Sequence, residues 1–335
     1  MSDSHNNIIQ ALKKNRIIWA PLNYLLASSR ILCYQPYQYL ASEYQELSTA
    51  LVVGRDYSFD YKAQDIVVIM DKYMPDPFGD DDSRWLYQYM AHVKNKAKSI
   101  IYLYVPEEDH VVNVTNLPVD RIIVFNSYTE AYLNKIKINV PISKLFEPHN
   151  TNSYYQILNI KKTISPKIII GFHGWEYPFP ALSKVLYRIQ NDFDVDYLFI
   201  VGENQTNNSF SDNITIKTVP WRLETFDFYM SQVDIGFRPV KPNFDHKSSW
   251  SPLEWLKFKK PVIVDGKMAE YKKDFPENWP MPMNEDEWYI EFVNLIKDET
   301  SRRELGDTGF IFLKENYSIS EYLFKLFENI LLSIK

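Results

Sequence analysis

The sequence predicts two consecutive α/β domains, each built on a parallel sheet that helices cover. Its length of 335 residues exceeds what one compact core usually accommodates. Short apolar runs alternate with helical stretches along most of the chain, an order that is typical of parallel sheets. The alternation pauses once and then restarts. We therefore expect an N-terminal domain over residues 1–155, a second domain over 160–317 and a C-terminal helix over 318–335.

Five strands are predicted in the first domain, because five short runs are rich in apolar, β-branched and aromatic residues. These runs are RIIWAP (16–21), TALVVG (49–54), DIVVIM (65–70), SIIYLYV (99–105) and DRIIVFN (120–126). Helices are predicted in ILCYQPYQYLASEY (31–44), despite its internal proline, and in SRWLYQYMAHVKNKAK (83–98). TNSYYQILNIKKTISP (151–166) is the expected connection.

The second domain repeats the architecture without repeating the sequence. Its predicted strands are KIIIGFHG (167–174), DYLFIVG (196–202), NITIKTVP (213–220), DIGFRPV (234–240) and PVIVDG (261–266). Helices are predicted in ALSKVLYRIQNDF (181–193), ETFDFYMSQ (224–232) and the amphipathic tail ISEYLFKLFENILLSIK (319–335). Ligands of open α/β sheets bind at the carboxyl ends of the strands, so we expect the site there.

Composition and simple motifs exclude several kinds of site. The net charge of −6 gives no global sign of nucleic-acid binding, although a local basic groove stays open. A single cysteine, Cys33, rules out an internal disulfide and a cysteine-rich metal site. The motifs GxGxxG, GxxxxGKS and GxxxxGKT are all absent. The acidic run Asp80–Asp82 could hold a cation or form a solvated loop.

The beginning of the chain, MSDSHNNIIQALKKN, lacks the apolar core of a signal peptide. No stretch approaches the roughly eighteen apolar residues of a membrane-spanning helix. We therefore expect a soluble, cytoplasmic protein without an integral membrane segment. Peripheral attachment to a membrane stays open.

The stretch DHKSSWSPLEWLKFKKPVIVDG (245–266) predicts a loop, a short helix and a buried strand. Pro252 suits the first turn of a helix, because its missing N–H would have no partner there. The free N–H groups of a helix N-terminus favour phosphate, and Lys247 with Ser248 could hold a diphosphate beside them. Glu254, expected in the first turn, could accept two hydrogen bonds from a ribose diol. A lysine and a glutamate near a helix start can also simply be solvated or capping.

Two further loops lie at predicted strand ends. In GFHGW (171–175), Gly171 and Gly174 could let backbone N–H groups approach an anion, or could form an ordinary tight turn. In VPEEDHVV (105–112), the side chains Glu107, Glu108, Asp109 and His110 could act as a general base or bind an acceptor hydroxyl, or could form a solvated acidic loop. A third candidate loop at the cleft contains Asn23, Ser28 and Arg30. Arg30 could pair with an anionic acceptor or a donor phosphate, or could cap a helix.

These residues together resemble a known family. The run VDIGFRPVKPNFDHKSSWSPLEWLKFKKPVIV is similar to the donor-binding region of GT-B glycosyltransferases, in the large retaining group that uses nucleotide-sugars (glycosyl transferases group 1 type). The matching positions are Asp234, Ile235, Gly236, Pro239, Lys247, Ser248, Glu254, Pro261, Val262 and Ile263. IIIGFHG, LFIVG and PWRLETFDFYMSQVDIG resemble earlier segments of the donor domain. IIWAPLNYLLASSR resembles the opening loop of a subset.

The resemblance implies a GT-B fold, in which two Rossmann-like domains face an interdomain cleft and the tail helix crosses back to the first domain. It implies that Glu254 binds the donor ribose and that Lys247 with Ser248 binds the diphosphate. The backbone around Trp221 and Arg222 would border the base. Lys247, the N–H groups of the helix and Arg238 or Arg222 would neutralise the charge on the leaving diphosphate, so that no metal is required. The remaining donor-side candidates are Gly171, His173, Gly174 and Arg238.

One position departs from the family pattern. Many members carry a glutamate eight residues before the ribose-binding one, where it contacts the sugar, and this chain has His246 there. Either the sugar is held differently or the site is weakened. We therefore count His246, with Glu107, Asp109 and His110, among the candidate catalytic residues.

The predicted function is transfer of a sugar from a UDP-, GDP- or dTDP-sugar to an acceptor hydroxyl with retention of configuration, by a hexosyl or pentosyl transferase (EC 2.4) that needs no cofactor. The acceptor is open among a surface polysaccharide or lipopolysaccharide, a lipid-linked glycan, a small molecule, a protein and a modified base of phage DNA. A non-catalytic GT-B-like binding or scaffold protein is the alternative. A GT-B-shaped epimerase or phosphorylase is a more remote one.

Overall fold

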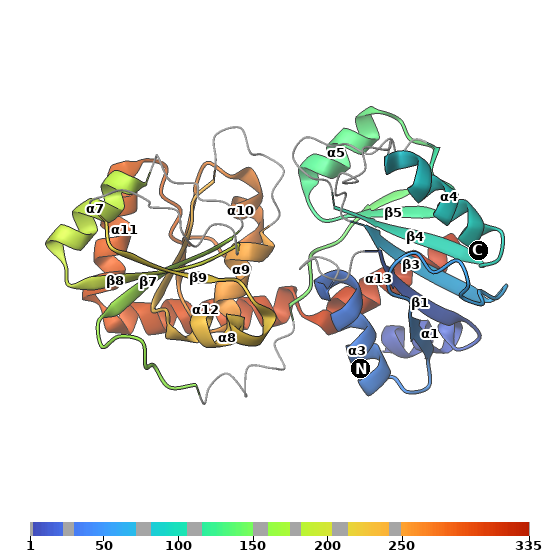
Figure 1. Ribbon diagram of the computed structural model, residues 1–335, viewed down its shortest axis with the longest axis horizontal. Coiled ribbons are helices and arrows are strands. Elements are labelled where there is room, and N and C mark those ends of the chain that lie inside the picture. Colours follow the sequence, from blue (N-terminus) through green and yellow to red (C-terminus); the bar gives the residue numbers. More distant parts are fainter. Residues whose placement is uncertain are drawn as a thin grey trace. The chain divides into compact units, whose positions relative to one another are not determined.

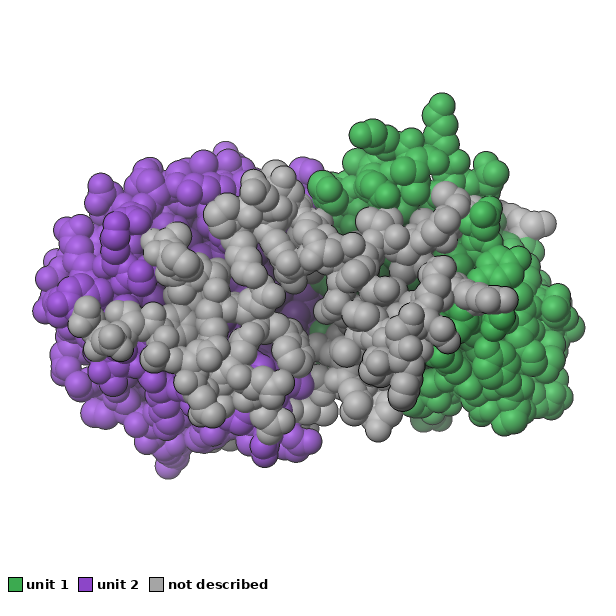
Figure 2. Space-filling view, turned by 45° about the horizontal axis from the view of Figure 1, so that its top comes forward, with its two compact units in different colours: residues 1–148, 317–335 green, residues 149–316 purple. Residues whose placement is uncertain are grey.

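A computed structural model describes residues 3–22, 30–71, 82–105, 116–149, 160–174, 182–202, 214–240 and 249–334. The chain divides into two compact units, which Figure 2 colours separately. Unit 1 comprises residues 1–148 and 317–335, and unit 2 comprises residues 149–316. The C-terminal segment therefore belongs to the same unit as the N-terminus.

Unit 1 contains a six-stranded sheet in the order β2-β1-β3-β4-β5-β6, and every neighbouring pair is parallel. The strands are β1 (Arg16–Pro21), β2 (Ser48–Leu51), β3 (Asp65–Asp71), β4 (Ser99–Tyr104), β5 (Arg121–Val124) and β6 (Ile142–Lys144). The described helices are α1 (Asp3–Leu12), the π-helical turn η1 (Arg30–Tyr34), α3 (Gln35–Glu43), α4 (Asp82–Lys94), α5 (Ser127–Lys135) and α13 (Ile319–Ser333).

The tail helix α13 packs within unit 1 against α1, as the blue and red ribbons of Figure 1 show. The ring of Phe324 stacks on His5 with 3.6 Å between ring centroids. Arg121, at the start of β5, donates to Ser333 Oγ at 3.0 Å. Seven apolar or aromatic side chains of α13 are buried, which explains its strong amphipathic pattern.

Unit 2 contains a five-stranded parallel sheet in the order β11-β10-β7-β8-β9. The strands are β7 (Ile168–Gly174), β8 (Val195–Val201), β9 (Ile216–Pro220), β10 (Ile235–Arg238) and β11 (Val262–Val264). The described helices are α7 (Ser183–Asp192), α8 (Leu223–Gln232), α9 (Trp250–Lys257), α10 (Ala269–Asp274), α11 (Glu285–Lys297) and α12 (Glu299–Asn316).

Both faces of the second sheet are covered, α7 and α11 lying on one side and α8, α9 and α12 on the other (Figure 1). The strand order reverses between β7 and β10, because the chain runs from β7 out to β9 and then returns to β10. Open α/β sheets bind ligands outside the carboxyl ends of their strands at such a reversal. The end of β7, the end of β10 and the start of α9 therefore define the region of interest.

Two glycines fix the position of α9 on this sheet. Gly171 and Gly236 are register partners on β7 and β10. A Cβ atom on Gly236 would lie 2.5 Å from the ring of Trp255, and one on Gly171 would lie 2.9 Å from the same ring. Because neither glycine has a side chain, the Trp255 indole lies directly on the sheet and is fully buried.

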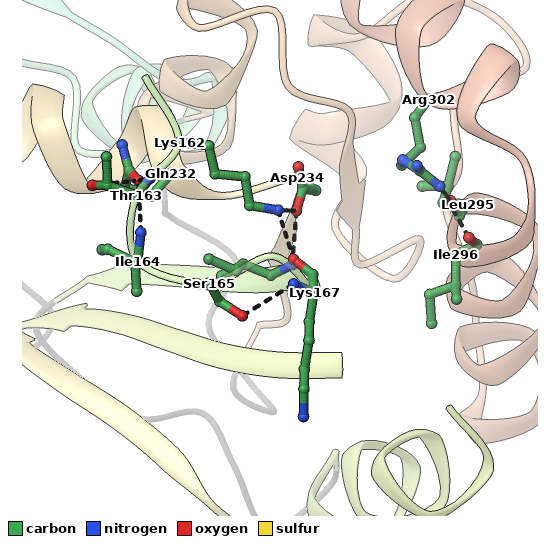
Figure 3. Close-up of polar contacts among 11 residues, drawn as sticks. Lys162, Thr163, Ile164, Ser165, Lys167, Gln232, Asp234, Leu295, Ile296 and Arg302 are labelled. Carbon is green, nitrogen blue, oxygen red and sulfur yellow. Dashed lines mark hydrogen bonds and ion pairs between the residues drawn. The ribbon is translucent and has the colours of Figure 1, made fainter. Parts of the chain in front are cut away.

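The segment that leads into β7 is held by a buried glutamine at the end of α8 (Figure 3). The Gln232 Oε1 atom accepts from the backbone N–H groups of Thr163 at 2.6 Å and Ile164 at 3.2 Å. Its Nε2 atom donates to the carbonyl of Lys161 at 3.1 Å. Beside it, the Lys162 ammonium forms an ion pair with Asp234, which also accepts from the backbone N–H of Ile169 at 2.8 Å.

The predicted fold class is confirmed, since both sheets are parallel and have interleaved helices. The expected helix over 31–44 begins as the π-helical turn η1 before α3. The structure adds the short edge strand β6 and the helices α1, α5, α10, α11 and α12, which had not been individually predicted. The proposed connection over 151–166 lies outside the described residues up to residue 159. Among the described helices, none has the length and apolar character to cross a membrane.

Candidate functional site

Three elements meet at the reversal point through His173. This residue lies near the end of β7, and its Nε2 atom is 2.7 Å from the carbonyl oxygen of Ser251 in the first turn of α9. Because a carbonyl only accepts, Nε2 carries the proton and donates. The Arg238 Nη1 atom, from the end of β10, donates to the carbonyl of His173 at 3.0 Å. The ends of β7 and β10 are thereby joined to the start of α9.

His173 is neutral at physiological pH. Burial and the nearby positive charge of Arg238 together lower its pKa to about 4. The imidazole is also enclosed by rings, with centroid distances of 5.2 Å to Trp255 and 5.5 Å to Phe226. It therefore acts here as a fixed hydrogen-bond donor and not as a cation.

Glu254 lies in the second turn of α9 and not in the first turn as expected, because the helix begins at Trp250. Pro252 lies in the first turn, as predicted. Its side chain is only 7% exposed. The Oε2 atom is 3.0 Å from Nδ1 of His149, and the Oε1 atom is 3.3 Å from Nζ of Lys257. Both carboxylate oxygens therefore have partners inside unit 2.

The ionisation of this buried group follows from its neighbours. Burial alone would raise the pKa of Glu254, but the Lys257 ammonium and the hydrogen bond from His149 outweigh burial and lower the pKa to about 2. Burial would also lower the pKa of Lys257, yet the carboxylates of Glu254 and Asp227 raise it. Asp227 Oδ1 is 3.7 Å from Lys257 Nζ. At neutral pH the cluster thus holds a carboxylate and an ammonium in contact.

Aromatic rings surround these polar groups. Trp250 stacks on His149, with 5.7 Å between ring centroids and 9° between ring planes. Phe226 lies between His173 and Trp221, at 5.7 Å from the Trp221 ring. Trp221 continues β9, since its N–H donates to Val201 at 2.7 Å. Tilted and stacked aromatic rings therefore lie beside the buried charges at the carboxyl edge of the sheet.

The position of the Arg238 guanidinium explains why residue 174, in the predicted anion-binding loop, is a glycine. A Cβ atom on Gly174 would lie 2.4 Å from the Arg238 guanidinium, so only glycine leaves that group in place. Gly171 lies inside β7, where its missing side chain accommodates Val233 and Trp255. The two glycines therefore occupy different environments, one at the strand end and one within the sheet.

The segment between β10 and α9 is fixed at both of its described ends. The backbone N–H of Val240 donates to Asp265 Oδ2 at 3.2 Å. Ser249, which immediately precedes α9, donates from Oγ to Asp274 Oδ2 at 2.6 Å. Between these anchors lie His246, Lys247 and Ser248, outside the described residues.

Other predicted residues also fall outside the described residues. They are Asn23, Ser28, Asp80, Asp81, Glu107, Glu108, Asp109 and His110. For Arg30 and Asp82 only the backbone is described, at the start of η1 and α4. Arg222 is the N-cap residue of α8, directly after Trp221. In the described part of the chain, no group of three histidine, cysteine, aspartate or glutamate side chains is arranged to hold a metal ion.

Sequence reasoning missed His149, Trp250, Asp227 and Lys257. Lys257 could have been found, because it follows Glu254 by three residues on a predicted helix and such pairs share a face. His149 could not, because 105 residues separate it from Glu254 and it adjoins the expected connection between domains.

Comparison with known proteins gives matches in structure only. No family model and no curated protein matches the chain. HepE from Anabaena, solved in complex with UDP and glucose, has a TM-score of 0.62 and 9% identity, covering 94% of this chain and 99% of its own. BGT of phage T4, in complex with its UDP-glucose substrate, has a TM-score of 0.58 and 10% identity, covering 96% and 99%. An alpha-glucosyltransferase, in complex with UDP-glucose and DNA containing an abasic site, has a TM-score of 0.63 and 10% identity, covering 95% and 99%.

The match in each case extends over both units and almost the full length of the other protein. Two parallel sheets of six and five strands with interleaved helices are the shared arrangement. At such low identity, the comparison concerns the path of the backbone and not the side chains of a site. The fold expected from the donor-region motif is thereby confirmed: the chain has the GT-B fold.

Proposed function

We propose that this protein is a glycosyltransferase that moves a sugar from a nucleotide-sugar donor to an acceptor hydroxyl. The observation that supports this most is the full-length likeness to GT-B structures that hold UDP or UDP-glucose. A UDP-sugar, UDP-glucose first, is therefore the donor to test. GDP- and dTDP-sugars, which the sequence also allowed, are the next.

The donor would bind at the carboxyl edge of the second sheet, where His173, Arg238 and α9 meet. Lys247 and Ser248, just before α9, would bind the diphosphate. Arg238 and Arg222 supply further positive charge at the ends of β10 and β9. As the bond to the sugar breaks, negative charge grows on the leaving diphosphate, and fixed cations and helix N–H groups stabilise that charge. On this mechanism no metal ion is required.

The nucleoside would stack on Trp221 or Trp250, whose rings are partly exposed. Planar bases stack favourably on such rings. Glu254 would bind the ribose of the donor nucleotide. Gly174, at the end of β7, would lie beside the phosphates and the sugar, with Gly171 and His173 behind it in the strand. His246 would approach the sugar in place of the family's glutamate.

The first unit would supply the acceptor site, with Glu107, Asp109 or His110 as the base that accepts the hydroxyl proton. A base hydroxyl of modified DNA is a specific candidate, because the structural neighbours include a "DNA modifying enzyme beta-glucosyltransferase" and a DNA complex. Glycan, lipid-linked and small-molecule hydroxyls are the other candidates. Release of UDP from UDP-glucose should accelerate with the true acceptor and not with the same molecule lacking that hydroxyl.

Retention of configuration, and the choice between hexosyl and pentosyl transfer, remain predictions from the sequence resemblance. The structural neighbours include proteins named alpha- and beta-glucosyltransferase, so the fold is compatible with either product. The anomeric coupling constant of the first product, measured by proton NMR, decides between retention and inversion.

Thermal unfolding with nucleotides tests the proposal. A ligand that binds only the folded state stabilises it by about 2.7 kcal/mol at one hundred times its dissociation constant. We expect one of UDP, GDP or dTDP, or its sugar conjugate, to raise the melting temperature. Lys247→Ala should reduce that rise. Lys167→Ala is the control and should leave that rise unchanged. It removes the same charge, but at the amino end of the sheet, where Lys167 pairs with Asp194.

The alternative, a non-catalytic GT-B-like binding or scaffold protein, predicts a different result. If no nucleotide or nucleotide-sugar raises the melting temperature at millimolar concentration, the transferase proposal is wrong. Binding of a nucleotide-sugar without turnover, for every acceptor class, would instead support a binding protein.

A further inference from the structure

Ser249 is the N-cap residue of α9, and its side chain does not cap the helix. A serine in this position usually accepts a hydrogen bond from a backbone N–H group of the first turn. Here the hydroxyl instead donates to Asp274 Oδ2 at 2.6 Å, at the end of the neighbouring helix α10 (Figure 1). Ser249 is buried, so water competes little for this bond.

Another N-cap serine of the same chain does cap its helix. Ser318, before α13, accepts from the backbone N–H of Glu321 at 3.3 Å. Its backbone is extended, with φ −66° and ψ 149°, whereas Ser249 has φ −79° and ψ 3°. The extended conformation is the one from which an N-cap side chain reaches the first turn. Ser249 therefore has a conformation that leaves the first turn of α9 without a side-chain cap.

Two backbone N–H groups remain in that turn. An N-cap side chain bonds the N–H of the second or third helical residue, and in α9 the third is Pro252, which has none. Trp250 and Ser251 keep their N–H groups, and neither donates to a backbone carbonyl among the described residues. The Ser251 hydroxyl also has no hydrogen-bond partner in the described part of the chain. A capping serine would occupy the N–H of Ser251.

This turn lies at the proposed diphosphate site. The carbonyl of Ser251 accepts from His173 near the end of β7, and the Arg238 guanidinium at the end of β10 donates to the carbonyl of His173. Shortly before α10, the N–H of Asp265 donates to the carbonyl of Arg238 at 3.1 Å. Free N–H groups of a helix N-terminus and a guanidinium both favour phosphate. The segment that ends in α10 thus contacts both sides of the site.

We propose that Asp274 is a positioning residue that keeps Ser249 from capping α9, so that the N–H of Ser251 stays available to the diphosphate of the donor nucleotide. This inference rests on the proposed function. Asp274 acts on the ligand through Ser249 and needs no contact with it. Its own negative charge disfavours a nearby phosphate, so its benefit to binding must come from the N–H group that it keeps available.

Two single variants and their combination separate this role from a purely structural one. Asp274→Ala releases the Ser249 hydroxyl, which can then bond the N–H of Ser251 and compete with the phosphate. Ser249→Ala loses the same hydrogen bond but leaves no hydroxyl to compete. The double variant has no competing hydroxyl either. Asp274→Asn keeps an oxygen that accepts from Ser249.

The measurement is the calorimetric dissociation constant of the nucleoside diphosphate that stabilises the protein, UDP first. We expect Asp274→Ala to weaken UDP binding about fivefold, the equivalent of the roughly 1 kcal/mol of a serine N-cap. Ser249→Ala, Asp274→Asn and the double variant should each bind UDP within about twofold of the wild type. Asp298→Ala is the matched control, because Asp298 accepts from Ser301 Oγ at the same 2.6 Å, at the start of α12. It should leave UDP affinity unchanged.

Equal weakening by Asp274→Ala and Ser249→Ala, or a double variant no better than Asp274→Ala, would show a purely structural bond. Either result overturns the inference and leaves the proposed function standing, as does wild-type affinity in Asp274→Ala. Absence of any nucleotide binding by the wild type would overturn both. If Asp274→Ala does not fold, ¹⁵N NMR of the wild type replaces it. The amide resonance of Ser251 should shift with UDP and not with uridine, and a resonance that UDP leaves unshifted overturns the inference.

Discussion

At the scale of single residues, the contact between Glu254 and Lys257 determines whether α9 can hold a buried charge. Glu254 is 7% and Lys257 10% exposed. Breaking a buried ion pair by removing one partner leaves an uncompensated charge, which typically costs about 3–5 kcal/mol. The pair is therefore expected to matter more for the integrity of this helix than an ordinary surface pair does.

Lys257→Met should lower the free energy of unfolding by about 3 kcal/mol, because Glu254 and Asp227 lose their shared cation. Urea unfolding followed by circular dichroism measures this. Adding Glu254→Gln should restore part of the loss, since the orphaned charge is removed as well. A double variant that is less stable than Lys257→Met would contradict the expectation.

Two residues give the stability of unit 2 a defined dependence on acid. The pKa of His173 falls from 6.5 to about 4 and that of Glu254 from 4.5 to about 2 on folding. In each case the unfolded state binds protons more readily, so stability is complete above the unfolded pKa and is lost as pH falls through the folded pKa. His173 acts between about pH 6.5 and 4, and Glu254 between about pH 4.5 and 2.

Urea unfolding at a series of pH values should therefore show stability falling in two successive steps below pH 6.5. His173→Gln keeps a donor for Ser251 and should remove the upper step only. Glu254→Gln should remove the lower step only. A profile that His173→Gln leaves unchanged would show that the imidazole is not held neutral by burial.

At the scale of elements, the position of α9 depends on α12 as well as on the sheet. Gly306 of α12 lies against α9's end, where a Cβ atom would be 2.1 Å from the carbonyl oxygen of Lys259. Gly309, one turn later, faces Leu256 and the Trp279 ring. The two glycines let the helices approach closely, and so they help to hold Glu254 and Lys257 in place.

Gly306→Ala should destabilise the protein by about 1–3 kcal/mol, because α12 must move away from Lys259. At an open helical site the same change would stabilise by up to about 1 kcal/mol. Thr308→Ala, at an exposed position of the same helix, is the control and should change stability little. A Gly306→Ala protein as stable as the wild type would mean that the backbone adjusts freely here.

Elements with a strong period could be predicted, and short or irregular ones could not. The buried strands β3, β4, β7 and β8 could be predicted from their apolar composition, and α13 from its apolar stripe. The edge strand β6 has three residues, too few for any period. The first turn of α9 contains Pro252 as predicted, but Glu254 was expected one turn too early, because nothing local marked Trp250 as the first helical residue.

At the scale of the whole molecule, the order of strands and helices was sufficient to predict two parallel-sheet domains, and the resemblance of the donor-region motif supplied the GT-B fold. The donor-region motif indicated where a nucleotide would bind, because its residues follow predicted strands. It could not indicate the partners of those residues. His149 and Glu254 meet only through the folded chain, and the polar loops that hold Glu107, His110 and Lys247 carry no pattern that fixes a side chain in space.

Metal removal tests the proposed electrostatics of the complete enzyme. If Lys247, Arg238 and helix N–H groups neutralise the leaving diphosphate, turnover of the nucleotide-sugar should be unchanged within about twofold by EDTA. Rates measured after dialysis against chelator, with and without added Mg²⁺ or Mn²⁺, decide this. Loss of activity that only a divalent ion restores would show that a metal ion, and not these side chains, neutralises the leaving diphosphate.

The tryptophan that lies on two glycines has a consequence for sequence variation. Trp255, Gly171 and Gly236 occupy one shared volume, so an added methyl group at either glycine collides with the indole. A side chain at Gly236 can therefore be accommodated only if residue 255 is smaller than tryptophan, and one at Gly171 only if residue 233 is smaller as well. Among natural homologues that keep this architecture, a tryptophan at position 255 should be accompanied by glycine at both 171 and 236.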